Sequence, residues 1–235
     1  MHHLARTGFS LAHDYFPWRN TKAELEGCYG WLMRGEPREY FRPILWTNTA
    51  QCLPGYLQQG TRAAFLTRLV LAATLGASYG VYGPAFELCL AIPQEPGTEI
   101  YKDSEQYEVR RWDWAAPGNI RGVIQRINQI RRENPALQSN ESLQFHAVDN
   151  DRLIAYSKTT KDLSNVILTI VNLDAHSPQH GWVTLNLEHL GLTAAQQFMV
   201  EDLLNARSYW WEGPQNYVEL CPERRQAHVF RVVKG

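Results

Sequence analysis

Residues 40–51 contain the feature that most constrains the fold of this chain: an apolar run that stops abruptly in small polar residues. Ile44 to Trp46 has the composition of a buried strand, and Thr47-Asn48-Thr49-Ala50-Gln51 follows it directly. An apolar helix pattern then extends from Ala63 to Leu75. A strand that ends in polar groups before a long helix is the repeating unit of a (β/α)8 barrel, which carries its chemistry at the carboxyl ends of its strands. The pattern alone also fits an ordinary strand that enters a loop.

The first 138 residues read as three strand–helix units that follow the end of a helix. Strands are predicted at 9–18, 40–48 and 79–82, and helices at 21–33, 60–75 and 119–133. Thr21 and Glu24 have the spacing of a capping box, which predicts where the first of these helices begins. A closed barrel needs eight such units. We therefore expect residues 1–138 to form the last three βα units of a (β/α)8 barrel, with the part before them missing.

The pattern changes near residue 140, where short alternating runs separated by turn signals begin. The runs lie at 143–148, 153–157, 165–172, 181–187, 198–202, 217–220 and 228–233. Alternation of this kind predicts an all-β sandwich of roughly seven strands. The predicted fold class is thus α/β followed by all-β, with a domain boundary between residues 138 and 139.

Composition excludes several classes of protein. The 235 residues carry a formal net charge of −1, so no overall field favours nucleic acid or an anionic membrane. No apolar run reaches the roughly 20 residues that span a bilayer, and the first residues lack the apolar core of a secretory signal. The four cysteines are scattered, which is typical of free thiols in a reducing compartment, and we expect a cytoplasmic protein. The histidines show no metal-ligand spacing, so neither a metal nor another cofactor is predicted.

Aromatic residues are the most suggestive part of the composition. There are 8 Trp and 11 Tyr, with clusters at Trp112 and Trp114 and at Tyr209, Trp210 and Trp211. Sugar rings present apolar C–H faces that stack on aromatic rings, so a carbohydrate site is one interpretation of these clusters. Packing within the core is the other, because aromatic side chains dominate core energetics in general. Asp113 either contacts a sugar hydroxyl or caps its loop.

Several long motifs together resemble one family. They are Tyr15-Phe16-Pro17-Trp18-Arg19-Asn20-Thr21-Lys22, Tyr40-Phe41-Arg42-Pro43, Asn48-Thr49, Gly80-Val81-Tyr82, Phe86-Glu87-Leu88, Ala116-Pro117-Gly118-Asn119-Ile120, Arg131-Arg132-Glu133-Asn134-Pro135-Ala136-Leu137 and Val171-Asn172-Leu173-Asp174. These motifs are collinear over essentially the whole chain and resemble the α-1,4-glucan:maltose-1-phosphate maltosyltransferases of the α-amylase clan. The resemblance implies transfer of a maltosyl unit from maltose 1-phosphate to an α-glucan with retention of configuration.

The resemblance also implies where this chain departs from the family. A retaining enzyme uses a carboxylate nucleophile and a carboxylic acid/base, and in the family these lie on the fourth and fifth barrel strands, which are not expected here. The family's third carboxylate, an Asp that stabilises the distorted sugar, corresponds to Gln51. The Lys-Tyr pair that holds the donor phosphate corresponds to Gln106 and Tyr107, so the cation is lost. Tyr15 is expected to face the substrate, and Glu87 is expected to form a structural salt bridge.

Three functions stay open at this stage. The chain is a C-terminal piece of a maltosyltransferase that is inactive alone, or a non-catalytic partner that docks onto a separate N-terminal half chain, or a glucan-binding scaffold that uses Tyr209, Trp210 and Trp211. Whether it acts as an enzyme by itself is therefore uncertain from the sequence. The family substrates would be its small-molecule partners. Its protein partner is either an N-terminal half chain or a second copy of this chain, since the resemblance is to a family that is typically dimeric.

Overall fold

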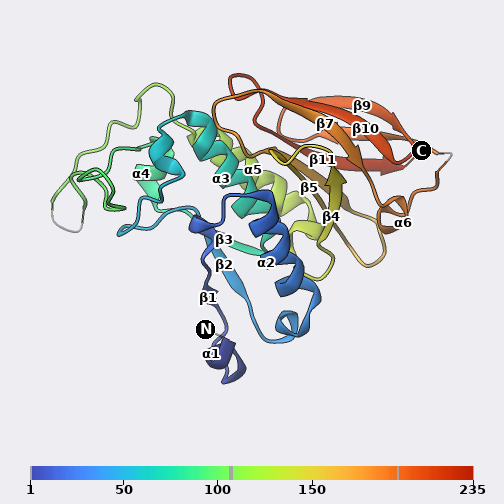
Figure 1. Cartoon of the computed structure of the whole chain (residues 1–235), viewed down its shortest axis with the longest axis horizontal. Coiled ribbons are helices and arrows are strands. Elements are labelled where there is room, and N and C mark those ends of the chain that lie inside the picture. Colours follow the sequence, from blue (N-terminus) through green and yellow to red (C-terminus); the bar gives the residue numbers. More distant parts are fainter. Residues whose placement is uncertain (1, 106–107, 195, 235) are drawn as a thin grey trace.

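The computed structural model describes residues 2–105, 108–194 and 196–234, in two parts that differ in strand direction (Figure 1). The first part contains three short parallel strands in the order β1-β2-β3 with helices around them. Its elements are α1 (His2–Arg6), β1 (Ala12–His13), η1 (Phe16–Trp18), α2 (Lys22–Arg34), η2 (Glu36–Glu39), β2 (Pro43–Trp46), η3 (Leu57–Gln59), α3 (Arg62–Leu75), β3 (Ser78–Gly80), α4 (Gly83–Glu87), α5 (Arg121–Glu133) and η4 (Pro135–Gln138).

The second part is one antiparallel sheet of eight strands in the order β10-β7-β4-β5-β6-β11-β8-β9. Its elements are β4 (Gln144–Val148), β5 (Leu153–Thr159), β6 (Val166–Asn172), β7 (Gln179–Thr184), α6 (Leu187–Leu190), β8 (Gln197–Asp202), β9 (Arg207–Glu212), β10 (Gln215–Leu220) and β11 (Ala227–Lys234). The two ends of the sheet curl toward each other around a core that includes Leu168, Val183, Phe198 and Phe230. A C-terminal β domain is therefore confirmed, with one strand more than the roughly seven expected.

Local sequence signals account for the helices. Thr21 caps α2 by accepting a hydrogen bond from the Glu24 backbone N–H at 3.3 Å, and the Glu24 carboxylate accepts one from the Thr21 N–H at 2.9 Å. This is the predicted capping box, which satisfies donors that a helix start leaves free. α5 is amphipathic, as its periodicity predicts: Ile127 and Ile130 are buried.

Helix α3 joins the two parts. It contacts β2 and β3 on one side and β6 and β11 on the other, so nearly every residue from Ala63 to Leu75 is buried. β5 and β6 are buried along their whole length because one face packs on the domain interior and the other on the helical layer. The main hydrophobic core thus includes residues from before and after the predicted boundary at 138, and that boundary stays a prediction.

One strand of the first part is shorter than predicted. The strand predicted at 9–18 is reduced to Ala12 and His13, because the chain turns into η1 at Phe16. Within the described residues no helix is both long and apolar enough to cross a bilayer. The predicted cytoplasmic location stays a prediction.

Candidate functional site at the strand ends

The carboxyl ends of the three parallel strands meet at one edge of their sheet. β2 pairs with β1 through Ala12 and His13 and with β3 up to Trp46 opposite Gly80. Because the strands are parallel, the segments that leave them, which begin at Asp14, Thr47 and Val81, emerge side by side. This edge is where chemistry sits in α/β folds, and we call it the strand-end site.

A layer of packed rings supports the site from below. The His13 imidazole stacks on the Trp46 indole at 5.6 Å between centroids with planes 24° apart. On its other side, a Cβ at Gly80 would come within 2.6 Å of the Trp46 ring, so glycine is required there. The buried Trp46 Nε1 has no hydrogen-bond partner among the described residues.

Asn48 fixes the backbone just above this layer. Its side chain is fully buried, and its Nδ2 donates to the Tyr101 hydroxyl at 2.8 Å and to the Tyr82 carbonyl at 3.2 Å. Its Oδ1 accepts from the Tyr82 N–H at 2.8 Å. These bonds join the end of β2 to the end of β3 and to the loop at Tyr101.

Gln51 lies in a tight turn closed by a bridge between Thr49 and Cys52. Its backbone N–H donates to the Thr49 hydroxyl at 3.3 Å, while its side chain is exposed and makes no hydrogen bond to any other described residue. Burial, followed by the neighbouring Glu99 carboxylate, raises the pKa of the Cys52 thiol to about 12. The turn therefore presents an uncharged amide to solvent, and its thiol is not a nucleophile at neutral pH.

Tyr15 stands at the end of β1 beside an aromatic and acidic group. Its ring is 57% exposed and lies 6.0 Å from the Trp18 ring. The Trp18 Nε1 donates to the Glu99 carboxylate at 2.8 Å, and the Gly55 N–H donates to the same carboxylate at 3.1 Å. Glu99 thus links η1 to the segment that follows Gln51.

Arg68 of α3 anchors the same segment from inside. Its guanidinium is buried, donates to the carbonyls of Phe16 and of Arg19, the latter at 2.8 Å, and lies 3.8 Å over the Phe16 ring. Burial lowers the pKa of Arg68 to about 10, which still leaves it charged at neutral pH. This role could not be predicted from the sequence, because an arginine within an apolar helix pattern reads as an exposed interruption.

Aromatic hydrogen-bond donors surround Glu105. Its carboxylate accepts hydrogen bonds from the Tyr82 hydroxyl and from Trp112 Nε1, the latter at 2.9 Å, and Arg110 lies 4.5 Å over the Trp112 ring. Burial, together with Glu105, raises the pKa of Tyr82 to about 12. Gln106 and Tyr107, the predicted phosphate-binding pair, lie outside the described residues.

The other predicted residues have structural roles. The Asp113 carboxylate accepts from the Ala115 N–H at 3.0 Å and so caps its own loop. Glu87 pairs with Arg121 at 3.4 Å, which confirms the expected salt bridge. Within the described part of the chain, no three His, Cys, Asp or Glu side chains gather in a way that could hold a metal ion.

The aromatic run on β9 is divided between two faces. Tyr209 and Trp211 point into the core of the β domain, where their rings lie 6.0 and 5.3 Å from the Phe230 ring, while Trp210 points outward and is 70% exposed. Successive side chains of a strand face opposite ways, so these three rings do not form one sugar platform. The core-packing interpretation holds for two of them.

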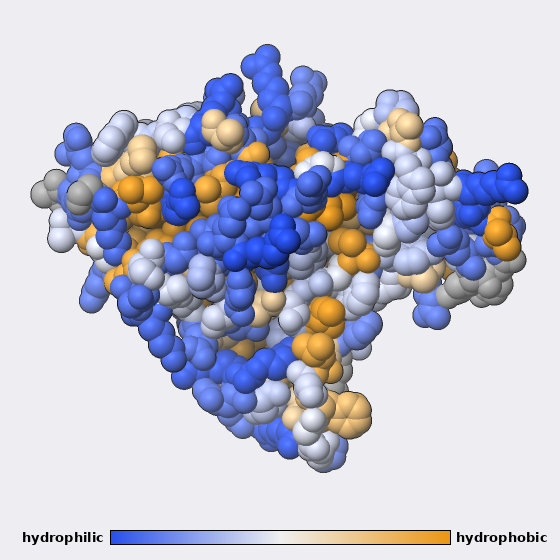
Figure 2. Space-filling model, turned by 180° about the vertical axis from the view of Figure 1, so that it is seen from behind, coloured by the Kyte–Doolittle hydropathy of each residue, from blue (hydrophilic) through white to orange (hydrophobic). Residues whose placement is uncertain are grey.

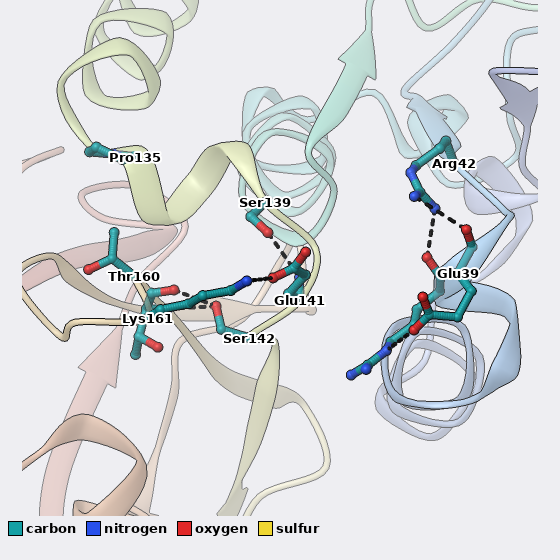
Figure 3. A pocket seen from close by; sticks show the side chains of 10 residues that line it. Glu39, Arg42, Pro135, Ser139, Glu141, Ser142, Thr160 and Lys161 are labelled. Atoms are coloured by element: carbon teal, nitrogen blue, oxygen red, sulfur yellow. Dashed lines mark hydrogen bonds and ion pairs between the residues drawn. The ribbon is translucent and has the colours of Figure 1, made fainter.

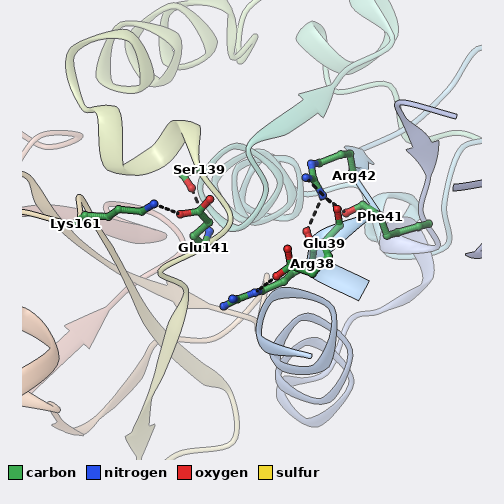
Figure 4. A network of polar contacts seen from close by, with 7 residues as sticks. All are labelled: Arg38, Glu39, Phe41, Arg42, Ser139, Glu141 and Lys161. Atoms are coloured by element: carbon green, nitrogen blue, oxygen red, sulfur yellow. Dashed lines mark hydrogen bonds and ion pairs between the residues drawn. The ribbon is translucent and has the colours of Figure 1, made fainter. Parts of the chain in front are cut away.

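A cavity of about 590 Å³ lies at the opposite, amino end of β2 (Figure 3). Its lining comes from η2 on one side and from the β domain on the other, and includes Arg42 and Lys161. Both cations already have partners: Lys161 lies 3.3 Å from the Glu141 carboxylate, and the Arg42 guanidinium donates to the Arg38 backbone carbonyl at 2.6 Å (Figure 4). Because the amino ends of such strands serve stability, this cavity is not our candidate site.

The strand-end site can bind and orient more readily than it can exchange protons. Its carboxylates are occupied: Asp14 accepts from Tyr29 and Arg19, as Glu99 and Glu105 accept from the donors described above. Exposed rings, an amide and tyrosine hydroxyls remain. Sequence analysis missed Glu99 and Glu105, since Glu99 bonds to Trp18 and Gly55, which are distant in the chain, and Glu105 joins Trp112 to the more distant Tyr82.

Comparison with solved structures identifies the class of fold. An α-amylase from Anoxybacillus superposes with a TM-score of 0.69 at 9% identity, over 99% of this chain and 49% of that one. The maltogenic α-amylase AmyB from Thermotoga neapolitana superposes with a TM-score of 0.63 at 12% identity, over 98% of this chain and 52% of that one. The chain has the fold of part of an α-amylase-like protein.

Sequence comparison finds similarity to one group of relatives. A protein family described as "GLGE, C-terminal" matches residues 145–232. The α-1,4-glucan:maltose-1-phosphate maltosyltransferase of Chlorobaculum tepidum is 46% identical over 99% of this chain and 35% of its own length, and that of Methylacidiphilum infernorum is 44% identical over 97% and 34%. By sequence, the chain matches the C-terminal region of these maltosyltransferases, and the predicted resemblance is confirmed. It spans about a third of the length of these relatives.

Proposed function

We propose that this chain supplies the last three βα units of a (β/α)8 barrel, together with a β domain, to a maltosyltransferase that moves maltosyl from maltose 1-phosphate to an α-1,4-glucan. The observation that carries this proposal is the 46% sequence identity to a maltosyltransferase, which extends over 99% of the chain. The parallel order β1-β2-β3 and the strand ends gathered at one edge support it.

In this proposal each strand end has a role. Gln51 takes the position of the family's stabilising Asp, and Tyr15 contacts the sugar from the end of β1. Tyr107 donates a hydrogen bond to the donor phosphate, while Gln106 replaces the family cation and so removes a charge-assisted contact. Residues 1–235 alone turn over no maltose 1-phosphate, because double displacement needs a nucleophile and an acid/base on strands that these residues do not contain.

A second function, that of a partner which completes a split barrel, is favoured by the uncovered face of the parallel sheet. Ile44 and Trp46 on that face are only partly buried. Near the α1 end, Leu4, Phe9 and Leu11 are more than half exposed, and Figure 2 shows hydrophobic side chains at the surface of this projecting end. An apolar face of this kind typically marks an interaction site.

Reconstitution tests both functions. The N-terminal two-thirds of the Chlorobaculum tepidum relative would be produced as a separate polypeptide and also fused ahead of residue 1, which gives the hybrid. Each protein and the mixture are incubated with maltose 1-phosphate and maltohexaose, and phosphate release is measured. We expect none from either piece alone and slow release from the hybrid. Release by the mixture would support the split-barrel partner.

Two results would overturn the proposal. Phosphate release by residues 1–235 alone, above a no-protein blank and through repeated purification, would show that the catalytic groups lie in this chain. A folded hybrid that binds maltose 1-phosphate but never releases phosphate, even with Gln51 changed to Asp, would show that these residues do not complete the barrel. Size-exclusion chromatography of the chain and the hybrid reports whether either is a dimer.

A further inference from the structure

Two exposed aromatic rings form a pair on the outer face of the β domain. Trp182 of β7 and Tyr217 of β10 are direct cross-strand neighbours, and their centroids lie 5.5 Å apart with planes at 65°. They are 51% and 48% exposed, and the His180 ring lies 5.8 Å from that of Tyr217. We call Trp182, Tyr217 and His180 the β7–β10 platform.

The backbone under the platform is held in place by the loop after β4. The Asp149 carboxylate accepts from the Trp182 N–H at 2.7 Å, and the Asp149 N–H donates to the Trp182 carbonyl at 3.3 Å. Asn150 Nδ2 donates to the His180 carbonyl at 2.9 Å. A Cβ at Gly181 would lie 2.5 Å from the Asp149 carboxylate, so only glycine lets the loop come this close. The backbone that carries Trp182 and His180 is therefore held in place before any ligand binds, which reduces the entropy cost of binding.

The chemistry of the face fits a neutral sugar chain. The outward side chains around the two rings are His180, Thr184, Gln215 and Glu219, so these two fully described strands present no Lys or Arg there. Without a cation the face offers nothing to a phosphate backbone or an anionic lipid. Aromatic faces for sugar C–H groups, with amide, hydroxyl and carboxylate groups at the rim for sugar hydroxyls, are what a pyranose chain requires.

A hydrogen bond between α2 and the end of β4 links the part of the chain that supports the platform to the part that follows β1. Lys22, the first residue of α2, donates through Nζ to the Val148 carbonyl at 2.8 Å, directly before the loop that holds Trp182. α2 itself starts just after η1, at the carboxyl end of β1. A glucan held on the platform would thus be fastened on the side of the molecule where the parallel strands end.

From these contacts we infer that the β7–β10 platform binds an α-1,4-glucan chain at a surface separate from the strand-end site. The choice of an α-1,4-linked glucan rests on the proposed function. The platform itself rests on the ring geometry and its supporting loop. By holding a long acceptor, it would raise the local concentration of chain ends near the strand-end site.

Affinity electrophoresis of the full 235-residue chain tests this inference without maltose 1-phosphate. Native gels with and without glycogen would compare the wild type with Trp182→Ala, Tyr217→Ala, Trp210→Ala and Tyr15→Ala, each checked by thermal unfolding. We expect glycogen to retard the wild type, maltoheptaose but not cellohexaose to reverse this, and each platform variant to weaken binding at least about tenfold, or about 1.4 kcal/mol. Trp210→Ala is the matched control, because its ring is more exposed yet lies on another strand, and it should bind like the wild type.

Several outcomes would overturn the inference. The first is that glycogen does not retard the wild type. The second is that folded Trp182→Ala and Tyr217→Ala bind glycogen as the wild type does. The third is that Trp210→Ala loses as much glycogen binding as the platform variants. If only Tyr15→Ala loses glycogen binding, the glucan binds at the strand-end site. If glucan does not bind but Trp182→Ala changes the oligomeric state, the face is a protein interface instead. Glucan binding by a chain whose hybrid never transfers maltosyl would keep the platform and reject only the proposed function.

Discussion

The side chain of Asn48 holds both backbone groups of Tyr82: its Oδ1 accepts from the Tyr82 N–H at 2.8 Å, and its Nδ2 donates to the Tyr82 carbonyl at 3.2 Å. It thereby extends the pairing of β2 and β3 beyond their last residues by means of a side chain. The same Nδ2 reaches the buried hydroxyl of Tyr101. One amide thus sets the relative position of the two loops that surround Gln51 and Glu105.

Replacing Asn48 by alanine should destabilise the protein strongly. The change removes the acceptor of the Tyr82 N–H and one of the two donors to the Tyr82 carbonyl, which keeps its bond from the Phe86 N–H. It also leaves the buried Tyr101 hydroxyl without its bond from Asn48, and we expect a loss of about 2–4 kcal/mol in the free energy of unfolding. Urea unfolding followed by tryptophan fluorescence measures it. Gln51→Ala, an exposed change in the same segment, is the control and should cost less than about 0.5 kcal/mol. Equal losses in the two variants would contradict the role given to Asn48.

Arg68→Met should also cost stability, because it removes the donor to two backbone carbonyls of the segment from Phe16 to Arg19. Hydrogen bonds that involve a charged donor typically contribute about 1.5–3 kcal/mol, and this is the loss that we expect. Arg62→Met changes an exposed arginine in the first turn of the same helix and should have little effect. Thermal unfolding of both variants gives the comparison. A similar melting temperature for the two would show that the buried guanidinium is not an anchor.

The sequence predicted well those elements whose signals are local. The capping box at Thr21 and Glu24 and the isoleucine spacing of α5 depend only on neighbours within a few turns, and both are found as expected. The position of Gln51 after a parallel strand also followed from a local change from apolar to polar residues. These predictions hold because helix caps and periodicities are determined by nearby residues.

The sequence could not predict contacts that depend on distant pairing. Tyr209, Trp210 and Trp211 read as one cluster because no strand was predicted at 207–212, yet in β9 the middle ring faces away from the other two. Conversely, Trp182 and Tyr217 become neighbours only through the register of β7 with β10. A residue's face and its cross-strand partner follow from register, which no single segment reveals.

Acid should weaken the fold through His146. Burial, and then the neighbouring His189, lowers the pKa of His146 to about 4 from 6.5. Its Nδ1 accepts from the Asn186 N–H at 3.2 Å, so Nε2 carries the proton and donates to the Ser157 hydroxyl at 2.8 Å. Between pH 6.5 and 4 the unfolded chain binds a proton that the folded chain does not. This contribution to stability is therefore complete above pH 6.5 and is lost as the pH falls.

The expected loss from this histidine is about 2 kcal/mol between pH 7 and pH 5. Urea unfolding at the two pH values measures it in the wild type and in His146→Gln, which cannot titrate and should lose less. His176→Gln replaces an exposed histidine and should show the same pH dependence as the wild type. A pH dependence identical in wild type and His146→Gln would rule out a neutral buried imidazole as the cause.

The final prediction concerns charge at position 51. The exposed amide of Gln51 can still bond a sugar hydroxyl, but it offers no negative charge to an oxocarbenium-like transition state. Loss of a preorganised electrostatic partner typically costs on the order of 10²–10³ in rate. Gln51→Asp in the hybrid should therefore raise kcat by about a hundredfold and change KM for maltose 1-phosphate little, as for a contact made chiefly in the transition state.

Gln51→Asn keeps a neutral amide and should stay slow, whereas Gln106→Lys should mainly lower KM by adding a cation for the phosphate. If kcat of a folded, donor-binding hybrid is the same with Gln51 and with Asp at that position, then residue 51 is not the stabiliser, and the turn between Thr49 and Cys52 has only a structural role.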